Sequence, residues 1–231
     1  MAEYVLKFTK TGYSKYISHL DLIRVFTRSF KIAELDIRYS NGFNPHPRMS
    51  FAQPLSLGYS SVAEYLEFET ETEHSEDELF ELLSPLLPEG IQILFIEPME
   101  LGKRSLGSET IAAEFEIRFA TDVSEDKLVE MMADYISQPE IIALKRMKKT
   151  KRLEETNIKG KIREISISKP DQAVIRCVLD QGSASNLSPE PLIQSFMKYT
   201  SLDIPRWEVD VKRTRLIFTD RIQFQHIDNT L

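Results

Sequence analysis

Apolar residues recur along the chain with two different periods, which together predict a fold of both strands and helices. Residues 3–9 alternate between apolar and polar side chains, as expected of a β-strand with one buried face. After residue 18, Leu22, Phe26 and Phe30 recur every four positions, the spacing of one face of an amphipathic helix. The chain therefore begins with a strand followed by a helix of roughly four turns.

The rest of the first half continues the same pattern. A helix is expected over residues 75–87, because Ser75 precedes a run of acidic residues that suits a helix N-terminus. Alternation and dense β-branched runs predict strands over residues 36–40, 62–70 and 91–96. The element order in the first half is thus strand, helix, strand, strand, helix, strand.

The second half is expected to repeat this order. Helices are predicted over residues 124–137 and from Ser188, with strands over residues 113–119, 141–147, 161–168, 173–179 and 207–219. The two helix starts of each half lie 57 residues apart (18 and 75) and 64 residues apart (124 and 188). We therefore predict an α+β fold of tandem duplicated ferredoxin-like units with antiparallel sheets, divided into domains 1–105 and 106–231.

Charge is distributed unevenly along the sequence. The chain has 29 basic and 36 acidic residues and a formal net charge of -7, which argues against general binding of nucleic acids. Residues 145–163, the basic segment, nevertheless contain nine basic residues against two acidic ones. This segment is either a solvated hairpin or a local phosphate-binding surface on an acidic body.

The single cysteine, Cys177, excludes an internal disulfide and a thiolate cluster supplied by this chain. We expect no metal site and no cofactor. No apolar run approaches the roughly 18 residues of a membrane helix, and the first residues do not resemble a signal peptide. These observations predict a cytoplasmic protein.

The start of the first helix carries candidate site residues. Ser18 followed by Asp21 has the spacing of a capping box, which explains both residues without any functional role. His19 would lie on the first turn, close to the free amides and the positive end of the helix dipole. This environment suits a phosphate or a carboxylate.

The second candidate region is the loop that contains Phe43, Asn44, His46 and Arg48. Prolines on both sides of His46 remove backbone donors and fix φ, so the loop must follow a stiff course. His46 could titrate or bind a phosphate, and Arg48 could bind a phosphate through two nitrogens. We expect Phe43 in the core, with stacking on a nucleobase as the alternative.

The sequence leaves open whether His19 and His46 share one pocket. If they converge with Asp21 and Arg48, acid-base chemistry becomes feasible. No serine triad, phosphate-binding glycine loop, dinucleotide fingerprint or zinc-protease motif is found in the sequence.

Several motifs of the first hundred residues resemble one bacterial family. They are Phe8-Thr9-Lys10-Thr11-Gly12, Ser18-His19-Leu20-Asp21-Leu22, Tyr39 to Pro47 (YSNGFNPHP), Pro54-Leu55-Ser56-Leu57-Gly58 and Glu64-Tyr65. Together they are similar to the radical-SAM-linked protein family, a domain of unknown function found beside or fused to radical SAM enzymes with a cobalamin-binding domain. The resemblance implies an accessory or substrate-presenting subunit for a radical SAM partner, with RNA as a possible substrate. The second half fits this family only in its length and in its lysine-rich middle.

These observations favour a non-catalytic module that binds RNA, either tRNA or rRNA, for a radical SAM enzyme. Arg24, Arg28, Lys31, Arg48 and the basic segment would contact phosphates. The expected substrate-binding residues are Ser18, His19, Arg24, Arg28, Asn44, His46, Arg48, Lys145, Lys148, Lys149, Lys151 and Arg152.

Two alternatives remain. One is an enzyme that cleaves or modifies RNA, with His46 as the acid-base residue and His19 or Asp21 assisting. The predicted layout is also similar to that of the CRISPR repeat-processing endonucleases, although their C-terminal glycine-rich loop is missing here. The other alternative is a protein-protein adaptor.

Overall fold

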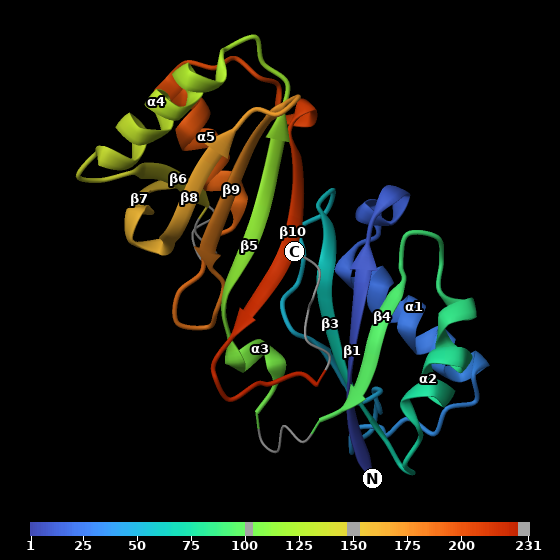
Figure 1. Ribbon diagram of the computed structural model, residues 1–231. Helices are drawn as coiled ribbons and strands as arrows, with labels where there is room; N and C mark the ends of the chain where they lie inside the picture. The colour runs from blue at the N-terminus through green and yellow to red at the C-terminus, as the bar shows by residue number, and fades with distance from the viewer. Residues whose placement is uncertain (100–103, 147–152, 226–231) are drawn as a thin grey trace. The chain divides into compact units, whose positions relative to one another are not determined.

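The computed structural model describes residues 1–99, 104–146 and 153–225 of the chain (Figure 1). It divides into two compact units, Met1–Thr110 with Phe218–Leu231 and Ile111–Ile217. Both units combine helices with antiparallel strands, so the expected α+β class is confirmed.

In the described part of the first unit, four strands pair with one another in the antiparallel sense, in the order β4-β1-β3-β2. Its elements are β1 (Ala2–Lys10), η1 (Gly12–Tyr16), α1 (His19–Ile32), β2 (Met49–Phe51), β3 (Ser60–Thr70), α2 (Glu76–Leu83), η2 (Ser84–Leu86), β4 (Ile93–Pro98) and α3 (Leu106–Glu109). Leu6 faces Leu66 on one side and Ile96 on the other, which fixes the register of the three long strands.

Both long helices of the first unit pack on the same face of its sheet. Phe26 of α1 is fully buried and meets Phe8 of β1 edge-to-face at 5.1 Å between ring centroids. Leu79 and Leu83 of α2 are buried in the same cluster. Burial of one such side chain stabilises the folded state by roughly 2 kcal/mol. The apolar positions that predicted α1 are therefore the ones that attach this helix to the sheet.

The C-terminal segment covers the opposite face of this sheet. Phe224 stacks on Tyr65 of β3 at 5.1 Å, and Phe218 meets the same ring edge-to-face at 5.2 Å. The backbone amide of Gln225 donates to the buried carboxylate of Glu97 in β4. These contacts explain why residues after 217 belong to the first unit.

Within the second unit the sheet strands follow the order β10-β5-β9-β8, and β9 pairs antiparallel with both β5 and β8. Its elements are β5 (Thr110–Phe119), α4 (Glu125–Ser137), β6 (Ile142–Arg146), β7 (Leu153–Asn157), η3 (Lys159–Lys161), β8 (Ile162–Ser168), β9 (Ala173–Asp180), α5 (Pro189–Thr200), η4 (Arg206–Glu208) and β10 (Asp210–Phe218). Strands β6 and β7 form a separate two-stranded sheet.

Tyr135 of α4 anchors the core of the second unit. Its ring meets Phe196 of α5 at 5.3 Å, and its hydroxyl lies 2.5 Å from the Oγ atom of Ser195. Burial raises the pKa of Tyr135 to about 12, so the phenol stays neutral.

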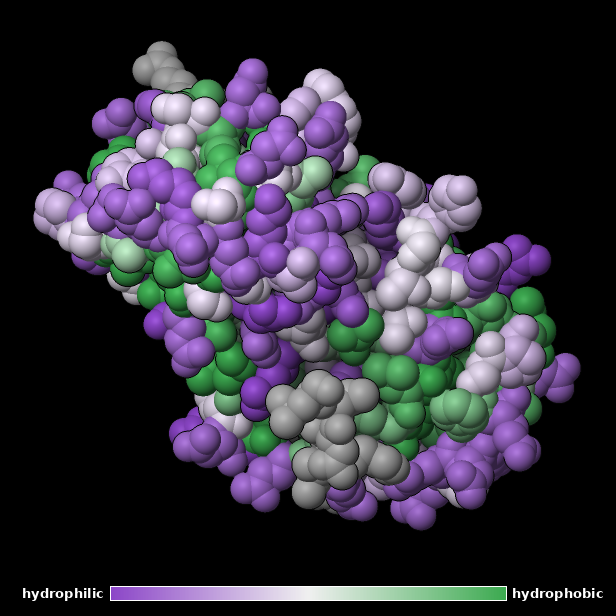
Figure 2. All heavy atoms as spheres, turned by 45° about the horizontal axis from the view of Figure 1, so that its top comes forward, coloured by the Kyte–Doolittle hydropathy of each residue, from purple (hydrophilic) through white to green (hydrophobic). Residues whose placement is uncertain are grey.

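Figure 2 shows hydrophilic side chains over much of one face of the molecule, with smaller groups of hydrophobic side chains between them.

Two expectations about elements were wrong. Residues 36–40 do not form a strand but make single bridges at Ile37 and Tyr39, and Met49–Phe51 takes the place beside β3. The helix expected over residues 75–87 changes after Leu83 into the short helix η2, because Pro85 cannot continue the α-helical hydrogen bonds. No element was predicted for residues 106–109, which form α3. The basic segment includes strand β7, which pairs with β6 as a hairpin, one of the two alternatives given for this segment.

Candidate nucleic-acid interface

Residues 38–48 form a closed hairpin, here called the Pro-His-Pro hairpin. The amide of Ser40 donates to the carbonyl of His46 at 2.8 Å, and the amide of His46 donates to the Ser40 hydroxyl at 3.0 Å. At its base, the amide of Arg48 donates to the carbonyl of Arg38 at 2.7 Å. The backbone of this segment is therefore held by hydrogen bonds between the two sides of the hairpin as well as by its prolines.

Phe43 lies at the tip of this hairpin and is fully exposed. The expectation that it enters the core was wrong. The Ser40 and His46 hydrogen bonds close the loop before the tip, so Phe43 has no path to the sheet. An exposed aromatic ring on a stiff loop is available for contact with a ligand.

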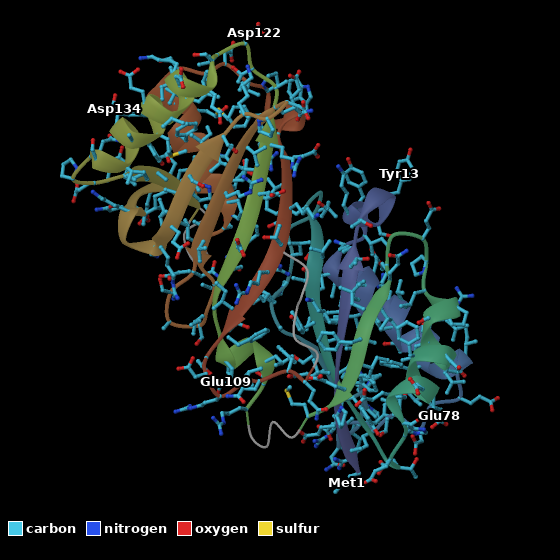
Figure 3. The ribbon with its side chains drawn as sticks, in the orientation of Figure 1. Met1, Tyr13, Glu78, Glu109, Asp122 and Asp134 are labelled. Atoms are coloured by element: carbon cyan, nitrogen blue, oxygen red, sulfur yellow. The ribbon has the colours of Figure 1, made fainter. Side chains whose placement is uncertain are left out.

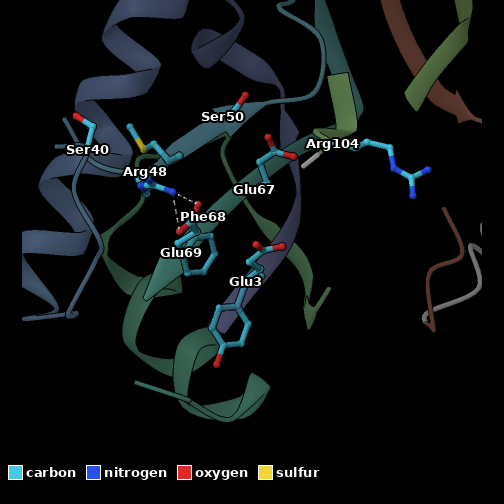
Figure 4. Close-up of a pocket in the computed structure, with 10 residues that line it drawn as sticks. Glu3, Ser40, Arg48, Ser50, Glu67, Phe68, Glu69 and Arg104 are labelled. Carbon is cyan, nitrogen blue, oxygen red and sulfur yellow. Dashed lines mark hydrogen bonds and ion pairs between the residues drawn. The ribbon is translucent and has the colours of Figure 1, made fainter. Parts of the chain in front are cut away.

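Arg48 lies at the base of the hairpin and is held by an acidic residue of β3. Its Nη1 atom is 3.2 Å from Oε1 of Glu69 (Figure 4). Arg38 binds Oε2 of the same carboxylate at 2.6 Å. The two guanidinium groups thus share one carboxylate. The charge of Arg48, one of the predicted site residues, is therefore partly compensated by Glu69.

A cavity of about 300 Å³ opens beside these ion pairs, between β1, β2 and β3. Its lining residues are Glu3, Tyr4, Ser40, Arg48, Met49, Ser50, Glu67, Phe68, Glu69 and Arg104 (Figure 4). Most of these residues were not predicted as site residues. Alternation along β3 places Glu67 and Glu69 on the same face, which is the only sequence signal that indicates them.

Acidic groups dominate the electrostatics of this cavity. Burial raises the pKa of Glu67, and the nearby charges of Glu3 and Glu69 act in the same direction. The backbone amide of Leu106 donates to Glu67 at 2.8 Å, which opposes that shift. Arg104 is within 3.4 Å of Glu109, so its charge is partly compensated. Such a cavity disfavours phosphate and suits a neutral or cationic group that forms hydrogen bonds.

The start of α1 is a capped helix end. The amide of Asp21 donates to the Ser18 hydroxyl at 3.2 Å, and that hydroxyl donates to the Asp21 carboxylate at 2.6 Å. Arg24 binds the other oxygen of Asp21 at 2.7 Å. The hydrogen bonds from Ser18 and Arg24 lower the pKa of Asp21. Ser18 and Asp21 are therefore engaged in helix capping.

The two histidines of the first unit's motifs contact different groups. The ring of His19 packs edge-to-face on Phe51 of β2 at 5.3 Å. His46 is exposed, and its Nε2 atom lies 3.4 Å from the side-chain nitrogen of Asn44. Among the described residues, no hydrogen bond or ring contact joins His19 to His46.

Three basic side chains form a stripe along the exposed face of α1. Arg24, Arg28 and Lys31 recur at intervals of four and three residues, so they project on one side of the helix, opposite Phe26. Within the described part of the chain, the side chains of Arg28 and Lys31 have no hydrogen bond or ion pair. We call Arg24, Arg28 and Lys31 the basic stripe; Arg28 and Lys31 are available to bind anions, whereas Arg24 is paired with Asp21.

The basic segment contributes less to the described structure than the sequence led us to expect. Lys148, Lys149, Lys151 and Arg152 lie outside the described residues. Lys145 lies in β6, where its register partner in β7 is Glu154. Arg163 is bound to Asp180 at 2.7 Å, so it has a structural role in the second unit.

None of the helices among the described residues has the length and apolar character that a membrane span requires. Within the same residues, no group of three His, Cys, Asp or Glu side chains is arranged to hold a metal ion. Cys177 is buried, and burial raises the pKa of its thiol to about 12.

Comparison with known proteins gives a family but no activity. No curated protein matches the chain. A chain of the solved structure "Crystal Structure of a Cbf5-Nop10-Gar1 Complex" is similar, with 13% sequence identity and a TM-score of 0.49, over 94% of this chain and 50% of that chain. The protein thus spans about half the length of that solved chain. A family profile matches residues 3–189, and the chain therefore belongs to the family described as "Uncharacterized protein conserved in bacteria (DUF2344)".

Proposed function

We propose that this protein is a non-catalytic module that binds RNA, either tRNA or rRNA, and presents it to a radical SAM partner enzyme. The observation that carries the RNA part is the basic stripe of α1. Its two unpartnered cations, Arg28 and Lys31, lie on an otherwise acidic protein. A localised set of cations binds a polyanion in one defined place.

The spacing of the stripe suits a nucleic-acid backbone. Arg24 and Lys31 are seven residues apart, about 10 Å along the helix axis. Consecutive phosphates of an extended strand can therefore meet successive cations. The Arg24 side chain is 77% exposed, and its surface ion pair with Asp21 contributes little, so it can exchange one carboxylate for a phosphate.

The enzyme alternative has less support. Ser18 and Asp21 are engaged in the helix cap, and His19 packs on Phe51 while His46 contacts Asn44. A general acid and a general base need to reach the same reacting group. The described geometry gives these candidates separate surroundings.

We infer that each unit is a copy of the ferredoxin-like βαββαβ architecture. The sheet strands of the first unit are β1, β2, β3 and β4, and those of the second are β5, β8, β9 and β10. Within each unit these strands follow the order fourth, first, third, second, which supports the inference. The hairpin of β6 and β7 is then an insertion in the second copy.

The role beside a radical SAM enzyme rests on the resemblance of the first hundred residues. Co-purification of that enzyme with the full chain, with and without nuclease, tests this part. A complex that survives nuclease in a variant that does not bind RNA would favour the adaptor alternative.

Lys31→Gln and Lys198→Gln form a matched pair for the RNA proposal. Each lysine lies in the last turn of its helix and is exposed, and neither has an ion pair among the described residues. Binding of a labelled single-stranded RNA is measured by fluorescence anisotropy from about 50 to 200 mM salt. We expect K31Q to reduce the slope of log affinity against log salt by about 0.7, and K198Q to leave it unchanged.

Equal slopes for the wild type, K31Q and K198Q would reject the basic stripe as the contact surface. Replacement of Lys145, Lys148, Lys149 and Lys151 by glutamine in the same titration measures the basic segment. A loss confined to that variant would transfer the RNA site from α1 to the second unit.

A further inference from the structure

Two tyrosines on the short helix η1 are exposed on the same side. Tyr13 is 91% exposed and Tyr16 is 61% exposed. Side chains three residues apart eclipse one another on a 3₁₀-helix, about 6 Å apart along its axis. Figure 3 shows the Tyr13 side chain pointing away from the rest of the first unit. We call this pair the tyrosine platform.

Buried side chains hold the backbone of η1 through hydrogen bonds. Lys10 is almost fully buried, and its ammonium group donates to the carbonyl of Ile17 at 2.8 Å. Burial of an ammonium group is costly unless it is hydrogen-bonded, so this contact fixes the end of η1. The buried hydroxyl of Ser14 donates to the carbonyl of Glu89 at 2.6 Å on the other side.

Gly90 completes this support. Its φ angle is +86°, and a Cβ atom at this position would lie 2.3 Å from the carbonyl oxygen of Thr11. The amide of Thr11 donates to the carbonyl of Gly90 at 2.8 Å. A rigid backbone below exposed rings lowers the entropy lost when a ligand orders them.

The platform also carries positive charge. The ammonium group of Lys15 lies 5.4 Å from the centroid of the Tyr16 ring. The amide of Gly58 donates to the carbonyl of Lys15 at 2.9 Å, and its neighbour Leu57 is 63% exposed. An aromatic face with a cation beside it offers stacking to a base and attraction to its phosphate.

We propose that the tyrosine platform stacks unpaired bases of single-stranded RNA. This inference rests on the proposed function, because the basic stripe of α1 follows the platform in the chain after the cap at Ser18. The bases stack on Tyr13 and Tyr16, and the phosphates continue toward Arg24, Arg28 and Lys31. Stacking needs bases that are not paired, so the substrate is a loop or an end rather than a duplex.

Charge complementarity favours RNA over a protein partner at this surface. Lys15 and the basic stripe add positive charge along η1 and α1, and the only acidic residue of α1, Asp21, is already paired with Arg24. Tyrosine rings beside cations are typical of sites that bind single-stranded nucleic acids. A protein that binds through the same rings is an outcome that the experiment below detects.

Trp207 provides the matched control. It is also an exposed aromatic residue on a 3₁₀-helix, η4 of the second unit, with 85% of its surface exposed. Y13A/Y16A, Y13F/Y16F and W207A are compared with the wild type in binding an unstructured RNA of about twelve nucleotides and a duplex of the same sequence. Thermal unfolding of each variant verifies folding.

We expect Y13A/Y16A to lower the affinity for single-stranded RNA by at least about tenfold and to leave duplex affinity unchanged. Y13F/Y16F should retain wild-type binding because the rings remain, and W207A should bind like the wild type. If Y13F/Y16F lost as much affinity for single-stranded RNA as Y13A/Y16A, the tyrosines would bind through their hydroxyl groups, and the stacking inference would be overturned.

The salt slope separates this inference from the proposed function. If K31Q reduces the slope but Y13A/Y16A keeps the wild-type affinity, the platform inference fails and the RNA-binding function stands. If the wild type binds neither RNA, both fail. Loss of the radical SAM partner in Y13A/Y16A with unchanged RNA binding would make the platform a protein contact and would also overturn the inference.

Discussion

The first long helices of the two units bury similar faces and expose opposite charges. Helix α1 buries Leu22, Phe26 and Phe30, and α4 buries Leu128, Met132 and Tyr135. On the exposed side, α1 has the basic stripe, whereas α4 has Asp126, Glu130 and Asp134 at a spacing of four residues. We call the second set the acidic stripe.

This contrast shows which part of a helix is set by folding and which part is available for function. The apolar spacing of both helices is required by the sheet beneath them. The outer positions contribute little to stability, because isolated surface charges are screened by solvent. The opposite stripes therefore point to different binding properties of the two surfaces.

Charge reversal on α1 should have the largest effect on RNA affinity, because it removes the difference in charge between α1 and α4. We expect R28E/K31E to reduce affinity for single-stranded RNA roughly 100-fold at low salt, because two attractive contacts become repulsive. K127E/K198E makes the same change in net charge on the helices of the second unit, and its effect should stay below about threefold. Equal losses in the two variants would mean that only total charge governs binding.

The N-terminal caps of α1 and α4 also differ, and removing them should have a smaller effect, on stability rather than on RNA binding. Ser18 accepts a hydrogen bond from the Asp21 amide, whereas Ser124 makes no side-chain cap hydrogen bond at α4. We expect S18A to lower the free energy of unfolding by about 1 kcal/mol and S124A by only a few tenths. Urea denaturation measures both. A large loss of RNA affinity in folded S18A would assign Ser18 a binding role after all.

The smallest expected effect is that of replacing His74, which should change the stability of the first unit without changing RNA binding. Its Nε2 atom lies 2.9 Å from Asp36, and its Nδ1 atom lies 3.3 Å from Glu78. Burial alone would lower the pKa of His74, but the hydrogen bonds and charges of Asp36 and Glu78 outweigh it and raise the pKa above its ordinary value.

A raised pKa in the folded state means that the ion pairs stabilise the protein fully below the ordinary histidine pKa of about 6.5. That contribution is lost as the pH rises through the higher pKa of the folded state. H74Q should therefore cost about 1 kcal/mol or less near pH 5.5, with a smaller cost at alkaline pH. RNA affinity at neutral pH should not change. A cost that grows with pH would contradict this assignment.

Much of the fold was predictable from local pattern. The spacing of Leu22, Phe26 and Phe30 predicted α1, because the helix buries one face. The alternation from Tyr4 to Phe8 predicted β1, but not that its second face is buried as well. The second strand was misplaced because Ile37 and Tyr39 have the composition of a strand. Ile37 instead makes a single bridge to Thr70 of β3 and Tyr39 a single bridge to Pro47, and composition does not encode which partners such residues meet.

The candidate site was predicted less completely. Arg24, Arg28 and Lys31 were recognised because helical spacing places them opposite the core. The cavity beside Glu67 depends on the pairing of β1, β2 and β3, and the exposure of Phe43 depends on where its hairpin closes. The tyrosine platform was missed because aromatic residues near a strand end are usually expected in the core. Its position depends on the buried Lys10 ammonium group, which the sequence does not reveal.

Photo-cross-linking tests the central claim most directly. Single-stranded RNA that contains 4-thiouridine is bound to the full chain, irradiated and digested, and the modified residues are identified by mass spectrometry. The account predicts cross-links at Tyr13 or Tyr16 and along α1, with none on the acidic stripe of α4. Cross-links confined to the second unit, with η1 and α1 unmodified, would contradict it.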